Sequence, residues 1–340
     1  MKVLTFGEMM LRLKPIGFER VVQTNGFEAA YGGAEANTAV SLAQLGHDAT
    51  YLTKLPENAL GEAAIGSLRK YGVDTARILR GGPRLGMYVF EKGNGARSTG
   101  VVYDRAGSSI ATANATEFNW QELLKDVEIF YFSGVTPAVS EELESALQEA
   151  LIYCKENNIT IVCDLNYRGK MWSPEKAQKS MAKIMPFVDV CIANDEDFEA
   201  TLGIKAFDGD MSRGIDQIDD FRDGMKEITK RYPNCKVVVS VLRNIHCVEQ
   251  SDWMAILYQN EKFYDTPIHN INVMEGVAAG DAFGAGFLHG FINKFEPQEC
   301  IDFAIAASVL KLSISGDYNL VTEAEIRGAM QKGSTARLSR

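Results

Sequence analysis

The apolar positions of the chain fall into two alternating kinds of run. Short continuous runs rich in β-branched and aromatic residues occupy 2–7, 49–53, 127–132, 159–165, 187–193 and 236–242. Segments with apolar residues at helical spacing separate most of them, at 35–46, 60–71, 140–156, 174–185, 195–203 and 217–231. Continuous apolar strands that alternate with helices predict an α/β fold, in which helices cover both faces of a doubly wound, mostly parallel sheet.

Two stretches break this alternation, at about 10–32 and 85–110. In the second, MYVFEK and STGVVYDR flank GNG, which predicts a hairpin with its turn. We expect the two stretches to form a small β-sheet, a lid over the carboxyl ends of the parallel strands, where doubly wound folds bind ligands. We therefore expect one domain over residues 1–331 with a discontinuous lid, and a mobile tail at 332–340, where the sequence has no periodicity.

Composition narrows the classes of partner. The 340 residues are 46% hydrophobic, enough for a large core, and 45 acidic residues outnumber 35 basic ones. This balance argues against wide contact with nucleic acid or an anionic membrane, so a few local groups must hold any phosphate ligand. Glu8 and Arg12 interrupt the apolar N-terminal segment, which predicts neither a signal peptide nor a membrane anchor.

Cysteine and histidine usage excludes two enzyme classes. The six cysteines form no C-x-x-C pair and have mostly apolar neighbours, which suits buried thiols in a reducing cytoplasm. None of the four histidines has the spacing of zinc ligands, and no serine lies in a nucleophile elbow. We therefore expect a cytoplasmic protein that is neither a zinc enzyme nor a serine hydrolase.

The segment AAGDAFGAGFLHGF at 278–291 carries the strongest chemical signal. Small residues precede a helix, and the bare N–H groups at a helix start bind anions. If a phosphate binds there, Asp281 lies in the first turn and is placed to take the proton from a hydroxyl that attacks the phosphate. The alternative is an ordinary buried helix whose N-terminus carries Asp281 as a cap.

A second glycine-rich segment, GGAEANTAVSLAQLG at 32–46, includes Gly33 and places Asn37 in the first turn of a helix. A Gly-Gly turn near the start and a Gly-Asp turn near the end resemble the two signatures of the ribokinase-like, or PfkB, carbohydrate kinases. The resemblance covers nearly the whole chain, including residues 54–75. It implies a three-layer αβα fold with a β-lid, and ATP and Mg²⁺ as cofactors. It leaves open a monovalent-cation requirement and a homodimer formed through the lid.

Within that family the chain most resembles 2-keto-3-deoxygluconate kinases, through YGGAEAN at 31–37, VVYDRAGSS at 101–109 and DLNYRGKMWS at 164–173. A sugar acid carries a carboxylate, which arginine grips bidentately, so Arg105 and Arg168 are the candidate ligands. Tyr88 and Tyr103 are expected to supply hydroxyls and an apolar wall. The alternative is that Arg105 pairs with a neighbour such as Asp104, that Arg168 pairs with Asp164, and that both tyrosines pack under the lid.

Three further segments resemble the nucleotide side of the family site. NDEDF, which begins at Asn194, is similar to the N-x-x-E segment associated with magnesium, with the shorter Asp197 in place of Glu. The alternative for Asp197 is an acidic helix N-terminus. VSVLRN at 239–244 makes Arg243 a candidate phosphate contact, and AASVLKLSISGDYN at 306–319 places Ala307 on the expected adenine side.

The chain departs from the family pattern D-T-x-G-A-G-D, or D-R-x-G-G-G-D, because residues 275–281 read EGVAAGD. Ala278 replaces a glycine, and alanine at a positive φ costs about 1 kcal/mol or more, so we expect a weakened anion hole. Gly280 and Asp281 are retained. Arg12 lies where many relatives carry an Asp that binds neutral sugar hydroxyls, which argues against ribose or a nucleoside as substrate.

The leading hypothesis is an ATP-dependent kinase that phosphorylates the terminal hydroxyl of 2-keto-3-deoxygluconate or a close sugar acid. Asp281 is then the general base, and the backbone N–H groups of Ala278, Ala279 and Gly280 stabilise the transferring phosphoryl group. A second hypothesis keeps this chemistry but takes fructose or another neutral sugar. A third is a catalytically weak relative that binds a sugar or a nucleotide.

Overall fold

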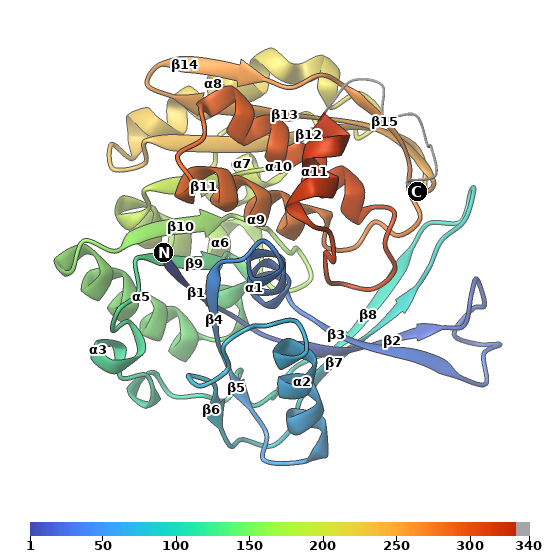
Figure 1. Ribbon diagram of the computed structural model, residues 1–340, viewed down its shortest axis with the longest axis vertical. Coiled ribbons are helices and arrows are strands. Elements are labelled where there is room, and N and C mark those ends of the chain that lie inside the picture. The colour runs from blue at the N-terminus through green and yellow to red at the C-terminus, as the bar shows by residue number, and fades with distance from the viewer. Residues whose placement is uncertain (331–340) are drawn as a thin grey trace.

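A nine-stranded sheet forms the centre of the protein, which a computed structural model describes over residues 1–330 (Figure 1). Its order is β14-β13-β12-β11-β10-β9-β1-β4, and β15 also pairs with β13. The parallel ladder comprises β1 (Lys2–Phe6), β4 (Asp48–Leu52), β9 (Ile129–Ser133), β10 (Thr160–Asp164), β11 (Val190–Ile192) and β12 (Val237–Cys247). The antiparallel strands are β13 (Gln250–Gln259), β14 (Lys262–Asp265) and β15 (His269–Asn272). The predicted mostly parallel sheet is confirmed.

Alternate residues of the parallel strands enter two separate cores, one on each face of the sheet. In β9, Phe130 and Phe132 belong to one core, and Ile129 and Tyr131 to the other. The first core includes α3 (Trp120–Leu123), α5 (Glu141–Glu156), α6 (Pro174–Ile184), α7 (Asp197–Leu202) and α8 (Ile218–Arg231). The second includes α1 (Ala34–Gln44), α9 (Ala279–Ile292) and α10 (Pro297–Lys311). Since both faces are covered, the strands are mostly apolar on both sides, and the three-layer αβα arrangement is confirmed.

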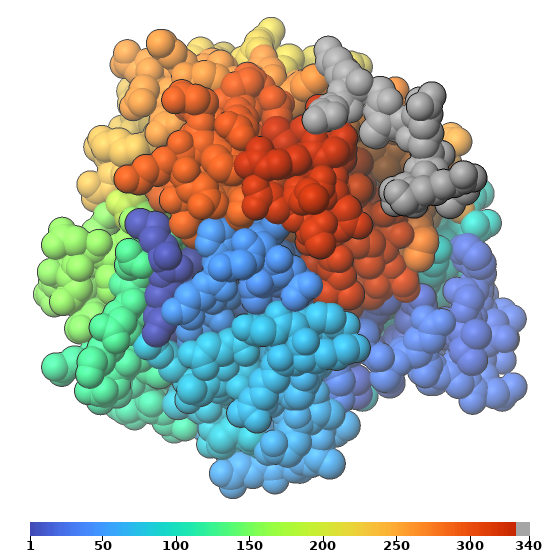
Figure 2. Space-filling view, in the orientation of Figure 1, coloured from blue at the N-terminus to red at the C-terminus, as the bar shows by residue number. Residues whose placement is uncertain are grey.

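The remaining helices extend these layers. Helix α2 (Ala59–Arg69) packs on α1, α11 (Glu323–Met330) packs on α10, and α4 (Val135–Val139) follows β9. Figure 2, in the orientation of Figure 1, shows the side of the molecule covered by α1, α2, α10 and α11. The short strands β5 (Lys54–Leu55) and β6 (Leu79–Arg80) form a separate two-stranded sheet.

The lid is a second sheet of four strands, in the order β3-β2-β7-β8. Its strands are β2 (Met10–Pro15), β3 (Phe27–Gly32), β7 (Gly86–Glu91) and β8 (Gly100–Asp104). Strands β7 and β8 form the predicted antiparallel hairpin, and the turn between them includes Gly95 at φ 55°. Figure 1 shows the lid projecting from one side of the main sheet, and β3 and β8 are its two edge strands.

The antiparallel extension of the main sheet was not predicted. Strand β12 runs on to Cys247, beyond the expected end at residue 242, and turns into β13 through Val248 and Glu249. Tight hairpin turns are usually recognised by Asn, Asp or Gly, and neither turn residue is one of these. The turn residues therefore do not predict this strand pair.

Two further sequence expectations concern the C-terminal tail and the absence of a membrane anchor. The predicted mobile tail at 332–340 lies outside the described residues. Within residues 1–330, no helix combines the length and the apolar character that crossing a membrane requires.

Candidate active site

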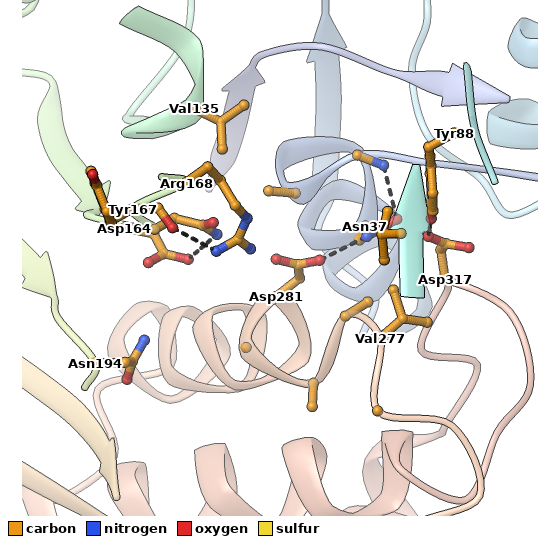
Figure 3. A pocket seen from close by; sticks show the side chains of 18 of the residues that line it. Asn37, Tyr88, Val135, Asp164, Tyr167, Arg168, Asn194, Val277, Asp281 and Asp317 are labelled. Atoms are coloured by element: carbon orange, nitrogen blue, oxygen red, sulfur yellow. Dashed lines mark hydrogen bonds between the residues drawn. The ribbon is translucent and has the colours of Figure 1, made fainter. Parts of the chain in front are cut away.

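A pocket of about 470 Å³ lies between the lid and the carboxyl ends of β10, β11 and β12 (Figure 3). This is where ligands bind in doubly wound folds. Almost every residue singled out from the sequence lines it: Gly33, Asn37, Tyr88, Tyr103, Arg105, Arg168, Asn194, Asp197, Arg243, Ala278, Ala279, Gly280 and Asp281. The fold therefore brings together residues that are up to 248 positions apart, since 281 minus 33 is 248.

Helix α9 begins at the pocket. Among residues 1–330, the backbone N–H groups of Ala279, Gly280 and Asp281 have no hydrogen-bond acceptor, and the first helical bond runs from Ala282 N to Ala278 O at 3.0 Å. A Cβ atom built on Gly280 would meet no protein atom within 4 Å. The helix therefore presents unpaired donors and open space on its pocket side, which is the arrangement of a phosphate site.

Asp281 lies in the first turn of α9 and is 7% exposed. Its Oδ2 accepts a hydrogen bond from Nδ2 of Asn37 at 2.7 Å, across to the first turn of α1 (Figure 3). Burial raises the pKa of Asp281 to about 7, although the Asn37 hydrogen bond and the charge of Arg168 act in the opposite direction. A carboxyl group whose pKa lies near neutrality suits a general base.

Asn37 is positioned by the glycine that precedes its helix. Gly33 is the N-cap of α1, and a Cβ atom at this position would lie 2.0 Å from the backbone oxygen of Glu8. A side chain at residue 33 would therefore push α1 away from the end of β1. The absence of a Cβ lets the helix start, and with it Asn37, approach Asp281.

Ala278 lies in the left-handed region, at φ 62° and ψ 15°. The positive φ expected at this position is confirmed, and because Ala278 already adopts the glycine-like conformation, the N–H groups of α9 are in place. We therefore expect Ala278→Gly to raise the free energy of unfolding by up to about 1 kcal/mol. The larger conformational entropy that glycine gives the unfolded chain reduces this gain.

Turnover of Ala278→Gly should stay within about threefold of the unsubstituted protein, because the conformation is unchanged. Thermal unfolding and initial rates measure the two effects separately. A rise in turnover of a hundredfold or more would instead show that alanine disables the loop.

The lid contributes two tyrosines to the pocket. The ring centroids of Tyr88 and Tyr103 are 5.8 Å apart, on neighbouring strands. The Tyr88 hydroxyl donates a short hydrogen bond to Asp317, which follows α10 and also lines the pocket. Tyr88 therefore ties the lid to the main domain as well as forming a wall of the pocket.

Arg105 follows the lid strand β8 and forms an ion pair with Glu8, at the carboxyl end of β1. Its Nε donates to Oε2 of Glu8 at 2.7 Å, and 14% of its side chain is exposed. The alternative in which Arg105 pairs with Asp104 is wrong, because Asp104 pairs with Arg84 at 2.8 Å. Arg105 remains a pocket residue whose charge is partly balanced by Glu8.

Arg168 follows β10 and extends into the pocket on the side of Asp281 (Figure 3). Its Nη1 donates to the backbone oxygen of Tyr167 at 3.0 Å, and no ion pair joins it to a carboxylate within residues 1–330. The alternative pairing with Asp164 is not observed, since Asp164 instead accepts from Asn166 at 3.2 Å. Arg168 thus carries a positive charge whose bidentate face remains available to an anionic ligand.

Asn194 lies just after β11, and Arg243 lies within β12, beyond the part that pairs with β11. Oδ1 of Asn194 accepts from Val241 N at 2.8 Å, which ties the end of β11 to β12. Arg243 forms an ion pair with Asp195 and lies 5.3 Å from the ring centroid of Trp253. Arg243 therefore lines the pocket in a fixed orientation, while the side chain of Asn194 already serves the fold.

A magnesium ion at the site expected near Asp197 would be held largely through water and phosphate oxygens. Asp197 accepts from the backbone N–H groups of Tyr167 and Asn194 at 2.7 and 2.9 Å, and burial raises its pKa to about 6. Oδ1 of Asp164 is buried and has no partner among the described residues. Within residues 1–330, no set of three or more His, Cys, Asp or Glu side chains is arranged to hold a metal ion directly.

Ala307 is the one predicted site residue that does not line the pocket. It is fully buried in α10, where its methyl group packs on Gly286 of α9, so that a Cβ at 286 would meet it at 3.0 Å. The structure thus gives Ala307 a packing role between two helices.

Several pocket residues were not predicted. Asp164 is the last residue of β10, Asn166 follows that strand, and Asp195 follows β11. Asn166 and Asp195 have φ values of 39° and 37°, in the left-handed region that strains most side chains. Polar residues directly after buried parallel strands were the available signal. Asp317 offered no such signal, because it follows a helix.

Most of the chain matches a known family. Residues 1–324 match the model of the pfkB family of carbohydrate kinases. The chain belongs to the PfkB family of carbohydrate kinases. A 2-dehydro-3-deoxygalactonokinase of Haloferax volcanii is 32% identical over 332 residues, which cover 98% of this chain and 97% of that protein. This PfkB protein is accordingly a carbohydrate kinase, a phosphotransferase whose acceptor is an alcohol group.

Solved structures agree with the family assignment. The 2-dehydro-3-deoxygluconokinase of Thermotoga maritima has a TM-score of 0.92 and 42% identity, and the match covers 97% of this chain and 99% of that one. A ribokinase II from E. coli, solved in complex with ATP and Mg²⁺, has a TM-score of 0.80 at 16% identity, covering 97% and 98%, and shows the fold alone. The ribokinase-like fold predicted from the sequence is confirmed.

Proposed function

We propose that this PfkB kinase transfers the γ-phosphoryl group of ATP to the terminal hydroxyl of 2-keto-3-deoxygluconate or a close 2-keto-3-deoxy sugar acid. The observation that carries the proposal is Arg168, a guanidinium in the pocket, on the side of Asp281, with no carboxylate partner in residues 1–330. A sugar acid supplies the missing carboxylate, which a neutral sugar lacks. The names of the relatives in Haloferax and Thermotoga support the same substrate class.

Each protein group has a distinct task in this reaction. The carboxylate of Asp281 takes the proton from the terminal hydroxyl as that oxygen attacks the γ-phosphorus. The N–H groups of Ala278, Ala279 and Gly280 stabilise the negative charge of the phosphoryl group in transfer. Arg243 and Asn194 lie on the nucleotide side, and Arg105, Arg168, Tyr88 and Tyr103 hold the sugar acid. Magnesium, near Asp197 and Asp164, would supply charge neutralisation for the nucleotide phosphates.

The experiment that tests the substrate is coupled ADP release with ATP and Mg²⁺, across 2-keto-3-deoxygluconate, its galactonate epimer, gluconate, fructose, ribose and no sugar. Activity confined to the keto-deoxy acids is the expected result. Activity on fructose alone would mean that Arg105 and Arg168 have structural roles and do not bind a substrate carboxylate. Thermal stabilisation by one sugar without any ADP release would indicate a protein that binds the sugar but does not phosphorylate it.

The pH dependence of the reaction follows from Asp281. Burial holds its pKa at about 7, and only the ionised form accepts a proton, so log(kcat/KM) should rise with pH up to about 7 and then level off. The Asn37 hydrogen bond stabilises the ionised form, so Asn37→Ala should move this acid limb to higher pH. Rates at saturating Mg²⁺ from pH 5 to 9 measure the acid limb in the unsubstituted protein and in Asn37→Ala. An unchanged limb in the variant would mean that another group controls it.

The exposed face of the lid supports a homodimer as part of this proposal. Ile16, Phe18, Val22 and Val102 are large apolar side chains of the lid region and are exposed, and no strand within residues 1–330 pairs with the outer edges of β3 and β8. Exposed edges and apolar patches favour association. Sedimentation velocity counts the subunits.

A monovalent-cation requirement remains a prediction, to be tested by replacing K⁺ with a bulky organic cation.

A cytoplasmic location also remains a proposal. The six cysteines are all free, and five of them are buried. Unpaired thiols in a protein with this many cysteines suit a reducing compartment.

A further inference from the structure

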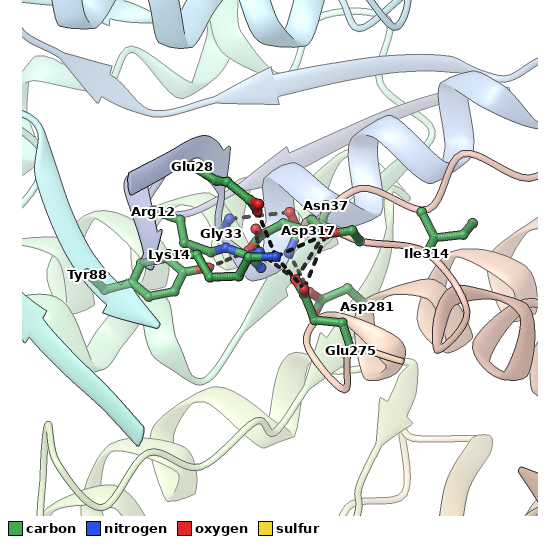
Figure 4. Close-up of polar contacts among 12 residues, drawn as sticks. Arg12, Lys14, Glu28, Gly33, Asn37, Tyr88, Glu275, Asp281, Ile314 and Asp317 are labelled. Atoms are coloured by element: carbon green, nitrogen blue, oxygen red, sulfur yellow. Dashed lines mark hydrogen bonds and ion pairs between the residues drawn. The ribbon is translucent and has the colours of Figure 1, made fainter. Parts of the chain in front are cut away.

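A group of buried charged side chains lies behind the loop that precedes α9 (Figure 4). Arg12 and Lys14 come from lid strand β2, Glu275 from the loop, and Asp317 from the segment after α10. Only 3% of the Arg12 side chain, 1% of Glu275 and 2% of Asp317 are exposed. Charges this deeply buried need partners of opposite sign, and each of these has at least one.

Glu275 is the centre of the group, because its carboxylate is held from two sides. From the lid, Arg12 donates a short hydrogen bond to Oε1, and Nζ of Lys14 lies 3.3 Å from Oε2. From the other side, Gly316 N donates to Oε1 at 3.0 Å and the Ser315 hydroxyl to Oε2 at 3.2 Å. Burial opposes ionisation, but Arg12 and the other donors keep the pKa of Glu275 below its ordinary value.

Arg12 also reaches the pocket wall. Its Nη1 lies 3.1 Å from Oδ2 of Asp317, whose other oxygen accepts from the Tyr88 hydroxyl. Tyr88 and Asp317 both line the pocket, whereas Arg12 and Glu275 do not. A continuous chain of polar contacts therefore joins the sugar side of the lid to Glu275.

The loop between Glu275 and α9 has few other restraints. The N–H groups of Met274 and Glu275 donate to Leu312 O at 2.8 and 3.2 Å. From Gly276 to Asp281, no backbone N–H has an acceptor among the described residues. The loop must nevertheless hold Ala278 at a positive φ, so its conformation depends on how firmly its start is anchored.

We propose that Arg12 and Glu275 are a positioning pair, which couples the lid to the loop at 276–278 and so holds the start of α9 in place for phosphoryl transfer. The pair acts through the loop, since neither residue lines the pocket. Movement of the lid then moves the anchor of the loop as well. The inference rests on the proposed transfer at the start of α9.

Three variants test the pair: Arg12→Met, Glu275→Gln and the double substitution. Glu275→Gln keeps the shape of the side chain and an amide oxygen that can accept from Gly316, and it loses the charge and the second acceptor, which faces Lys14 and Ser315. Each single variant should lower kcat by about 10- to 100-fold, as small displacements of reacting groups do, with the KM for ATP within about threefold. The double variant should lose about as much as one single variant, because the two residues act as one unit.

Hydrogen exchange gives a readout that does not depend on turnover. In Arg12→Met, a lid substitution, the hydrogen-bonded amides at the two ends of the loop, those of Met274, Glu275 and Ala282, should exchange at least about tenfold faster. The matched control is Arg84→Met, which removes an arginine that pairs with Asp104 of the lid and does not line the pocket. It should leave both kcat and the exchange of these three amides unchanged.

The outcomes separate this inference from the proposed function. A folded Arg12→Met whose kcat and loop exchange both match the unsubstituted protein overturns the pair, as does a double variant whose losses multiply. If the unsubstituted protein phosphorylates no sugar, the proposed function fails and exchange alone decides the pair. If Arg12→Met does not fold, Glu275→Gln and Arg12→Lys decide it by the same limits.

Discussion

Replacing Asp281 with Asn is expected to lower kcat by about 10²- to 10⁴-fold, the range that a positioned general base contributes. Asparagine has nearly the same shape and can still accept the hydrogen bond that Asn37 donates to Asp281 at 2.7 Å. It cannot take a proton from the sugar hydroxyl. The affinity for the sugar acid, measured by calorimetry, should therefore remain close to that of the unsubstituted protein.

The same variant should be at least as stable as the unsubstituted protein at pH 8. The folded-state pKa of Asp281 is about 7, above the ordinary 3.8, so this group's contribution to the free energy of unfolding falls as pH rises between these values. Asparagine removes this cost, which should add roughly 1 to 3 kcal/mol at pH 8. Thermal unfolding at pH 5 and pH 8 measures it, with a larger gain expected at pH 8.

Asp302→Asn is the matched control, because Asp302 lies on α10, bonds to Gln298 and does not line the pocket. It should leave kcat unchanged. Turnover of Asp281→Asn within about tenfold of the unsubstituted protein, below the range of general-base effects, would remove Asp281 from the proton transfer.

Arg168→Met is expected to lower kcat/KM for the sugar acid by about 30- to 1000-fold, which corresponds to the loss of roughly 2 to 4 kcal/mol of charge-assisted hydrogen bonding. The change for a neutral ketose should be smaller, because a neutral ketose has no carboxylate to lose and shares only the effect on Asp281, whose pKa the charge of Arg168 lowers. Arg168 is the cleaner of the two arginine tests, since no protein carboxylate among residues 1–330 is left unpaired by its removal. The ratio of kcat/KM for the acid to that for fructose is the quantity to measure.

Arg168→Lys should show an intermediate loss, because lysine keeps the charge but not the planar pair of donors. Arg105→Met should also reduce the ratio, but its removal leaves Glu8 buried without its ion pair, so part of its effect will appear as lower stability. Equal losses for the acid and for fructose would assign Arg168 to the general architecture of the pocket instead of to carboxylate recognition.

Local patterns were enough for the parallel sheet, its helices and the start of α9. Strands such as β10 are short, mostly apolar runs, and helices such as α5 repeat apolar residues at helical spacing. Each of these elements can therefore be predicted from its own segment of sequence. The hairpin of β12 and β13 was missed because its turn, Val248 and Glu249, lacks a characteristic turn residue. The local signal was absent, although the pairing is extensive.

The sequence by itself determined the fold class, the lid hairpin and the candidate role of Asp281, because apolar periodicity, turn residues and small residues before a helix have local meaning. The resemblance to sugar-acid kinases indicated the candidate roles of Arg105 and Arg168. Only the tertiary structure decided which groups these residues meet. Arg105 pairs with Glu8 and not with its neighbour Asp104, and the buried Arg12–Glu275 pair joins residues 263 positions apart. Such partners depend on how β2, the 275 loop and the segment after α10 pack together, and on which charges that packing removes from water. No periodicity or spacing along the chain encodes those distances.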